Sequence, residues 1–192
     1  MQNTVEMVLE EIKKRQQADK RLLVSIDGRC AAGKTTLAKA LKEKLDCDVI
    51  AMDHFFLPPE KRTEKRLQEP GGNVDYERFL EEVLLPLKAG KPFSYRPYDC
   101  QSQNFSEPIP IACKSVSIVE GSYSCHPTLW DAYDLHIFLA ITPDLQMQRI
   151  LHRNGPDKAE IFRTKWIPLE EKYFQHFSVE ERCEVKVTCG VA

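Results

Sequence analysis

Short apolar runs along the chain predict a buried parallel sheet. Each run has the length of a strand, and the run at 135–141 is nearly all apolar, which is typical of a strand covered on both faces. The predicted strands cover residues 22–27, 47–53, 114–121, 135–141 and 184–189.

Between the strands, apolar residues recur every three or four positions, which is the spacing of an amphipathic helix. The predicted helices cover residues 3–17, 35–45, 76–87, a segment that begins at 142, and about 157–177. Gly90 is expected to stop the third helix, and Pro168 is expected to kink the last one. Strands that alternate with helices form right-handed crossovers. We therefore expect an α/β fold with three layers, α/β/α, in which helices cover both faces of a mostly parallel sheet.

The stretch between the second and third strands departs from this alternation. Residues 57–74 are charged and rich in proline and glycine, which predicts an irregular loop. Residues 92–113 contain four prolines and alternate loosely, which predicts a hairpin. We expect 54–113 to form an insertion above the sheet, inside a single domain that covers residues 1–192.

The residues after the first strand form a phosphate-binding pattern. They fit G-x-x-x-x-G-K-[ST] between a strand and a helix, the setting that a P-loop requires. The stretch is Gly28, Arg29, Cys30, Ala31, Ala32, Gly33, Lys34, Thr35 and Thr36. Glycines let the backbone approach the phosphates, and successive N–H groups at the helix start bind them. The sequence therefore predicts an ATP site in which Lys34 reaches the β- and γ-phosphates and the Thr35 hydroxyl binds Mg²⁺.

Acidic residues stand at the ends of two predicted strands, Asp53 after the second and Glu120 after the third. The carboxyl ends of parallel strands meet at the edge of the sheet where the P-loop also lies. In a P-loop protein this is the expected place for a second Mg²⁺ contact, which assigns Glu120 to the metal. Asp53 suits a base that orients an acceptor hydroxyl. The alternative for both residues is a structural role at the turn.

Two arginines lie four residues apart on the helix that begins at residue 142. Arg149 and Arg153 share one helix face and form part of a predicted lid, about 149–177. They are placed either to contact the transferred phosphoryl group or to lie in solvent or in an ion pair. The sequence does not decide between these alternatives.

The composition of the chain argues against nucleic acids and membranes as binding partners. With 27 Lys+Arg against 29 Asp+Glu and a net charge of -2, the chain has no basic surplus for a nucleic acid. No stretch has the length of a membrane span, and the first residues lack the apolar segment of a signal peptide. Seven cysteines without a C-x-x-C pair are typical of reduced thiols. We expect a cytoplasmic protein that binds neither nucleic acid nor membrane, and the sequence leaves a homo-oligomer open.

Several motifs together resemble the uridine kinase family of P-loop kinases. They lie at residues 26–37, 52–56, 98–99 and 118–123. Nicotinamide riboside kinase, pantothenate kinase and phosphoribulokinase are similar relatives, and the resemblance runs from about residue 20 to about residue 177. It implies an ATP- and Mg²⁺-dependent kinase that phosphorylates a small-molecule hydroxyl acceptor, a nucleoside or riboside.

The resemblance also implies roles for individual residues. Asp53 would be the general base for the acceptor hydroxyl, and Glu120 would assist Mg²⁺. Asp75 matches the aspartate that binds ribose hydroxyls, and Tyr98 belongs to the hairpin that touches the base. Arginines of the lid, here Arg149 among them, would close on the phosphates. Asp75 equally suits the N-cap of the following helix, and Tyr98 equally suits the core.

Two segments differ from the family pattern. The basic residues that usually follow the Tyr-Asp pair are replaced by residues 100–104, Cys-Gln-Ser-Gln-Asn, and the lid at 149–155 has fewer arginines. Both differences concern the acceptor more than phosphoryl transfer. The competing class is an NTP-driven switch that hydrolyses its nucleotide to change partners. The acid after the second strand and the 54–113 insertion favour the kinase.

Overall fold

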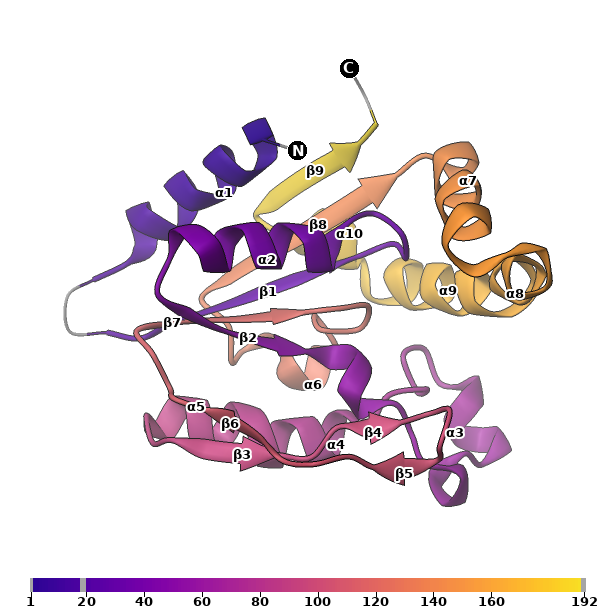
Figure 1. Cartoon of the computed structure of the whole chain (residues 1–192), viewed down its shortest axis with the longest axis horizontal. Coiled ribbons are helices and arrows are strands. Elements are labelled where there is room, and N and C mark those ends of the chain that lie inside the picture. The colour runs from indigo at the N-terminus through magenta and orange to yellow at the C-terminus, as the bar shows by residue number, and fades with distance from the viewer. Residues whose placement is uncertain (1, 18–19, 191–192) are drawn as a thin grey trace.

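A five-stranded parallel sheet forms the centre of the protein (Figure 1). The structure is a computed structural model, and it describes residues 2–17 and 20–190. The strands are β1 (Leu22–Gly28), β2 (Cys47–Ala51), β7 (Val116–Glu120), β8 (Leu135–Ile141) and β9 (Val185–Cys189). They pair in the order β2-β7-β1-β8-β9, and each pairing is parallel. Because β1 is the middle strand, the loop that follows it lies between the ends of β7 and β8.

Helices cover both faces of this sheet, as the sequence predicts. One face carries α1 (Gln2–Arg15) and α2 (Lys34–Lys44) (Figure 1). The other carries α4 (Tyr76–Phe79), α5 (Leu85–Ala89), α6 (Pro127–Trp130), α9 (Ile167–Phe177) and α10 (Val179–Arg182). Two further helices, α7 (Pro143–Asn154) and α8 (Pro156–Ile161), lie beyond the carboxyl end of β8 (Figure 1).

The two layers of core follow from the alternation of side chains along the strands. In β8, Ile137 and Leu139 belong to the core beneath α1 and α2, whereas Phe138 belongs to the core on the opposite face. In β1, Val24 belongs to the core beneath α1 and α2, and Leu23 belongs to the core on the opposite face. Successive strand residues point to opposite faces, so a strand covered on both sides needs apolar residues at consecutive positions. This requirement explains the apolar runs in the sequence.

The insertion between β2 and β7 contains the predicted hairpin. Its strands form two small antiparallel ladders, β3 (Phe93–Tyr95) with β6 (Ile109–Ile111) and β4 (Tyr98–Asp99) with β5 (Asn104–Phe105). The preceding helical segment consists of α4, a π-helical turn at Leu80–Leu84, and α5. It stops at Gly90 as predicted, where φ is 68°.

Three local features differ from the sequence prediction. The second strand ends at Ala51 and not at Asp53, which lies in a 3₁₀ turn, Met52–Phe55. The 57–74 segment includes a short helix, α3 (Glu64–Gln68), because the Thr63 side chain caps its first turn. A π-helical turn, Phe162–Trp166, precedes α9 where the sequence predicts a kink, since Pro168 has no N–H with which to extend an α-helical ladder.

Within residues 2–17 and 20–190, no helix combines the length and the apolar character needed to cross a bilayer.

Candidate active site

The loop between β1 and α2 is divided by its backbone hydrogen bonds. The N–H groups of its first part already have acceptors: Gly28 bonds Asp27 Oδ1 at 2.7 Å, Arg29 bonds the Leu139 carbonyl at 3.1 Å, and Cys30 bonds Glu170 Oε2 at 2.9 Å. Among the described residues, no acceptor is found for the N–H groups of Ala31, Gly33, Lys34, Thr35 and Thr36. Open N–H groups at the start of a helix bind anions. This second part of the loop is therefore available for phosphates.

Glycine is required at both ends of this loop. Gly28 has φ +133° and Gly33 has φ 99°, a region that other residues rarely adopt. A Cβ atom on Gly28 would also lie 2.1 Å from the carbonyl oxygen of Leu139. Only glycine lets the chain leave β1 so close to β8.

Lys34 lies at the mouth of the loop with its ammonium group on neutral oxygens. Its Nζ donates to the carbonyls of Gly28 at 2.5 Å and Arg29 at 3.0 Å, and to Ser122 Oγ at 3.2 Å. The side chain is nearly buried, with the residue 8% exposed. Hydrogen bonds to neutral oxygens are weaker than those to anions, so a phosphate can compete for this ammonium group.

Thr35, Glu120 and Asp53 gather next to the loop. The Thr35 hydroxyl lies 3.1 Å from each carboxylate oxygen of Glu120. The Asp53 carboxylate lies close to Gly121, the residue after Glu120, since a Cβ atom on Gly121 would be only 3.3 Å from Asp53 Oδ1. The structure thus brings together the two residues that the sequence predicts for the metal and the carboxylate that it predicts as the base.

This group fits a magnesium ion. Burial, and then the negative charge of Asp53, raise the pKa of Glu120, while Thr35 and Lys34 act in the opposite direction. A cation between the two carboxylates would relieve their repulsion. Mg²⁺ takes one or two protein carboxylates together with phosphate oxygens and water, and Glu120 with the Thr35 hydroxyl meets that need. Groups of three or more His, Cys, Asp or Glu at metal-binding distance do not occur among the described residues.

A large cavity of about 1880 Å³ opens from the loop toward the insertion. The P-loop and the ends of β2 and β7 form its floor, the insertion forms one wall, and the helices after β8 form the other. The predicted residues that line it are Cys30, Ala31, Gly33, Lys34, Thr35, Thr36, Asp53, Tyr98, Glu120, Arg149 and Arg153. This volume is sufficient for a nucleotide together with a small acceptor.

On the insertion side, Tyr98 and Asp75 occupy different positions. Tyr98 is 4% exposed, packs edge-on against Phe105 and lines the cavity, and its hydroxyl has no hydrogen-bond partner among the described residues. Asp75 lies behind the wall, where Oδ1 accepts the Arg78 N–H at 3.2 Å and Oδ2 accepts Lys61 Nζ at 2.8 Å. Asp75 therefore caps the helix that follows, and its role as a ligand stays a prediction.

The two lid arginines differ in their contacts. Arg149 donates to the Ala31 carbonyl at 3.0 Å, so α7 touches the open part of the P-loop. Arg153 bonds the side chain of the adjacent Asn154 at 2.8 Å and lies over the Phe162 ring. Neither forms an ion pair with a carboxylate of the described residues. Both guanidinium groups are therefore available to an anion in the cavity.

Two loop residues have structural contacts as well as their predicted place in the motif. The Arg29 guanidinium pairs with Glu171 at 2.6 Å and with Glu180 at 2.9 Å, and so points away from the phosphate side. Burial raises the pKa of the Cys30 thiol to about 12, so the thiol stays protonated and unreactive.

Sequence reasoning missed a set of residues behind the loop. The Asp27 carboxylate is fully buried and accepts hydrogen bonds from the N–H groups of Tyr123 and Cys125 and from the Tyr173 hydroxyl. Glu170 of α9 accepts the Ser122 hydroxyl at 2.6 Å. A carboxylate in an otherwise apolar strand is a signal that could have identified Asp27. Glu170 carries no local signal, because its partners lie far away in the sequence.

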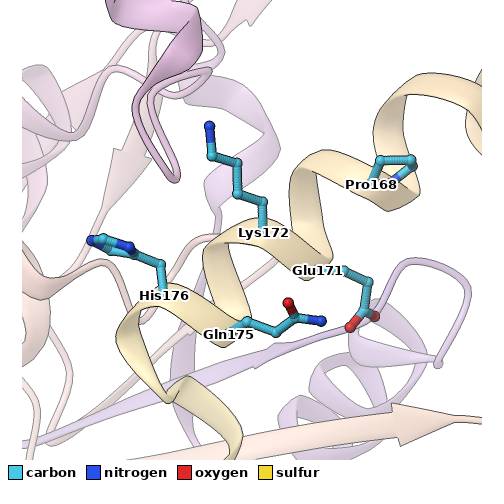
Figure 2. Close-up of a pocket in the computed structure, with 5 residues that line it drawn as sticks. All are labelled: Pro168, Glu171, Lys172, Gln175 and His176. Carbon is cyan, nitrogen blue, oxygen red and sulfur yellow. The ribbon is translucent and has the colours of Figure 1, made fainter.

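A second, smaller pocket lies on the surface of α9 alone. Pro168, Glu171, Lys172, Gln175 and His176 line it (Figure 2). In Figure 2, the Glu171 and Gln175 side chains extend from the opposite side of the helix to Lys172, and Glu171 is the residue that binds Arg29. None of the P-loop residues lines this pocket, so the large cavity is the candidate active site.

Known proteins resemble this chain in sequence and in fold. A curated pantothenate kinase from Shewanella woodyi is 26% identical over 207 residues, which cover 96% of this chain and 64% of the relative. A solved "possible uridine kinase" from Bacillus stearothermophilus has a TM-score of 0.74 at 19% identity, with 96% of this chain and 97% of that chain covered. A D-glycerate 3-kinase from Cryptococcus neoformans var. grubii has a TM-score of 0.65 at 15% identity, with 97% and 94% covered.

The chain has the fold of the uridine kinase-like P-loop kinases. This confirms the resemblance seen in the sequence. The chain spans less than two thirds of the pantothenate kinase that it matches, so the match does not extend to that whole protein. No family model matches the chain.

Asp27 should make the stability of the fold depend on pH. Burial raises the pKa of Asp27 from 3.8 to about 6, so the folded protein keeps a proton that the unfolded chain has lost. The stability that this proton contributes is present at low pH and is lost as pH rises through about 6. We expect the free energy of unfolding to decline between about pH 4 and pH 6 by an amount that is absent in Asp27→Asn.

Denaturant unfolding of both proteins at several pH values measures this difference. The other titrating groups are common to the two proteins and cancel. Parallel pH profiles would contradict the assignment of this titration to Asp27.

Proposed function

We propose that the chain is an ATP- and Mg²⁺-dependent kinase that transfers the γ-phosphate to a hydroxyl of a small molecule, a nucleoside or riboside. In this proposal residues 1–192 form one domain, 54–113 form the acceptor wall and about 149–177 form the lid. All seven cysteines are free thiols, which fits a cytoplasmic protein.

One observation carries the proposal. The Asp53 carboxylate lies beside Glu120 and Thr35 on the floor of the cavity that the open N–H groups of the P-loop also face. Phosphoryl transfer depends on alignment and on electrostatic stabilisation more than on covalent chemistry. A carboxylate next to the metal and the γ-phosphate position is what an in-line acceptor hydroxyl needs.

Different residues of the loop and the lid would have different roles in phosphoryl transfer. The N–H groups of Ala31 and of 33–36 would hold the phosphates, while Lys34 and Arg149 would stabilise the charge that develops on the transferred group. Thr35 and Glu120 would hold Mg²⁺, which supplies charge neutralisation between the phosphates. Asp53 would orient the acceptor hydroxyl and receive its proton.

The wall formed by the insertion supports a polyol acceptor. The Tyr98 hydroxyl is buried and unpartnered among the described residues, and a buried polar group without a partner is costly. This oxygen is shielded from solvent, so a hydroxyl or carbonyl of the acceptor would satisfy it once the adjoining part of the wall moves. Asn73 lines the same cavity and offers an amide donor and acceptor close to the predicted ribose-binding turn.

A nucleotide-driven switch is the competing proposal, since the P-loop alone would serve either class. The two proposals differ in what stimulates ATP turnover. A thermal-shift screen with an ATP analogue and a panel of nucleosides, ribosides, pantothenate and sugar phosphates identifies the acceptor, because a ligand stabilises the state that it binds. ATP turnover that rises with one of these compounds supports the kinase. Turnover that none of them changes supports the switch.

Asp53→Asn should separate acceptor chemistry from nucleotide binding. The change keeps the shape of the side chain and removes its charge, so ATP affinity should change little. Acceptor-dependent turnover should fall by about 10²–10⁴, the usual effect of losing a positioned acid or base. Both quantities are measured on one preparation, with Glu60→Gln on the outside of the insertion as the matched loss of charge. Equal losses in affinity and turnover would show that Asp53 supports the loop or the metal instead.

Glu120→Gln should act through the metal. We expect the Mg²⁺ concentration for half-maximal activity to rise by more than the KM of the acceptor, because the amide is a weaker ligand for a hard cation. The pKa of Glu120 is raised, and metal binding requires the ionised carboxylate, so the wild-type Mg²⁺ requirement should increase as pH falls through that pKa. Glu43→Gln, on the exposed face of α2, is the control. An unchanged Mg²⁺ titration in Glu120→Gln would leave this carboxylate with a structural role.

A further inference from the structure

Glu170 is a buried carboxylate that the proposed reaction does not yet use. It lies on α9, is 5% exposed, and forms no ion pair with a Lys, Arg or His of residues 2–17 and 20–190. Its two oxygens instead accept the Cys30 N–H at 2.9 Å and the Ser122 hydroxyl at 2.6 Å. Burying a charge without a direct partner is expensive, so these two contacts must compensate for it.

The contact with Ser122 leads to Lys34. A serine hydroxyl has one proton to donate. The strongest acceptor within reach of Ser122 is the Glu170 carboxylate at 2.6 Å, so the proton points toward Glu170. The 3.2 Å contact with Lys34 Nζ must then run from the ammonium group to the serine oxygen. The result is a relay from Lys34 through Ser122 to Glu170, in which the cation and the anion share one hydroxyl group.

The second contact fixes the P-loop from the side of the lid. Glu170 binds the N–H of Cys30, while Gln146 of α7 binds the Cys30 carbonyl at 3.1 Å. Both lid-side helices therefore hold the same peptide segment. The next residue along the loop is Ala31. Its N–H is the first of the open groups, and its carbonyl accepts a hydrogen bond from the Arg149 guanidinium.

The neighbouring acid of α9 makes a different kind of contact. Glu171 forms a direct ion pair with Arg29. An anchor that only joined α9 to the loop would need no more than this pair and the Tyr173–Asp27 hydrogen bond. Glu170 adds a link to the ammonium group of Lys34 that neither of these contacts supplies.

We propose that Glu170 is a positioning residue for phosphoryl transfer. Through Ser122 it orients Lys34, and through the Cys30 N–H it sets the loop conformation that presents the open N–H groups. It thereby couples the position of the lid helices to the arrangement of the phosphate site. This role rests on the proposed kinase function.

The test is a double-mutant cycle on Glu170→Gln and Ser122→Ala with steady-state kinetics. We expect each single change to lower kcat by about 10- to 100-fold, the effect of a small misplacement of a group that must be aligned. The acceptor KM should change by less than about threefold, since both residues line the cavity but form their hydrogen bonds on the P-loop side and none with the insertion. The double variant should lose little more than Glu170→Gln alone, because Glu170 reaches Lys34 only through Ser122, whereas its contact with the Cys30 N–H is absent from the effect of Ser122→Ala. Glu181→Gln, an exposed carboxylate of α10 outside the cavity and the lid, is the matched control and should keep wild-type kcat.

Several outcomes would overturn the proposal. Multiplying losses in the double variant would show that the two residues act independently. A Glu170→Gln variant with unchanged kcat would show that the carboxylate is only an anchor. Thermal unfolding is measured on each variant. If Glu170→Gln does not fold, Ser122→Ala breaks the relay from the other end, and a wild-type kcat in that variant rejects the proposal.

A parallel measurement separates this proposal from the kinase function itself. Affinity for an ATP analogue with Mg²⁺ is measured for the same four proteins of the cycle. If the wild type phosphorylates no acceptor in the panel, the kinase proposal fails, and the relay is judged on nucleotide binding alone. Non-additive losses of affinity in Glu170→Gln and Ser122→Ala would then support the relay, and additive losses would reject it.

Discussion

The buried carboxylate of Asp27 is the interaction on which the rest of the site depends. Its donors come from three segments: Gly28 of the P-loop, Tyr123 and Cys125 of the turn after β7, and Tyr173 of α9. A buried carboxylate is tolerated only when its oxygens are satisfied, so these segments must meet at one point. Their meeting fixes the phosphate loop relative to the end of β7 and to the helix that carries Glu170.

The register of the sheet then sets the level at which the chemical groups lie. Glu120 of β7 is paired with Ile26 of β1 and with Ala51 of β2. Gly28 follows Ile26 by two positions and Asp53 follows Ala51 by two, so both residues lie just beyond the level of Glu120. Parallel strands end at a common edge, and this is why the P-loop, Glu120 and Asp53, from three distant segments, share one cavity.

The sequence predicted what depends on local pattern. The apolar runs predicted β1, β7 and β8, and the glycine-lysine motif predicted the P-loop. The acids at 53 and 120 were predicted to lie at one edge of the sheet, and both line the cavity there. Contacts between distant residues carry no local signal, and these include the Glu170–Ser122 bond and the ion pairs of Arg29. The position of Asp53 in a 3₁₀ turn was missed because the apolar run continues through Met52, whose side chain is buried although the strand has ended.

The contacts of Asp27 and Glu170 have one common effect: they satisfy N–H groups in the first part of the P-loop and leave those in the second part open. The N–H groups of residues 28–30 end on protein acceptors, two of which are carboxylates, while Ala31 and residues 33–36 keep theirs open. If the protein satisfied all of them, a phosphate would have to break existing bonds to enter. If it satisfied none, the loop would lack a fixed conformation and would lose binding energy to ordering. Anchoring one part with buried acids leaves the other part rigid and unsatisfied, which is the preorganised state that an incoming phosphate stabilises.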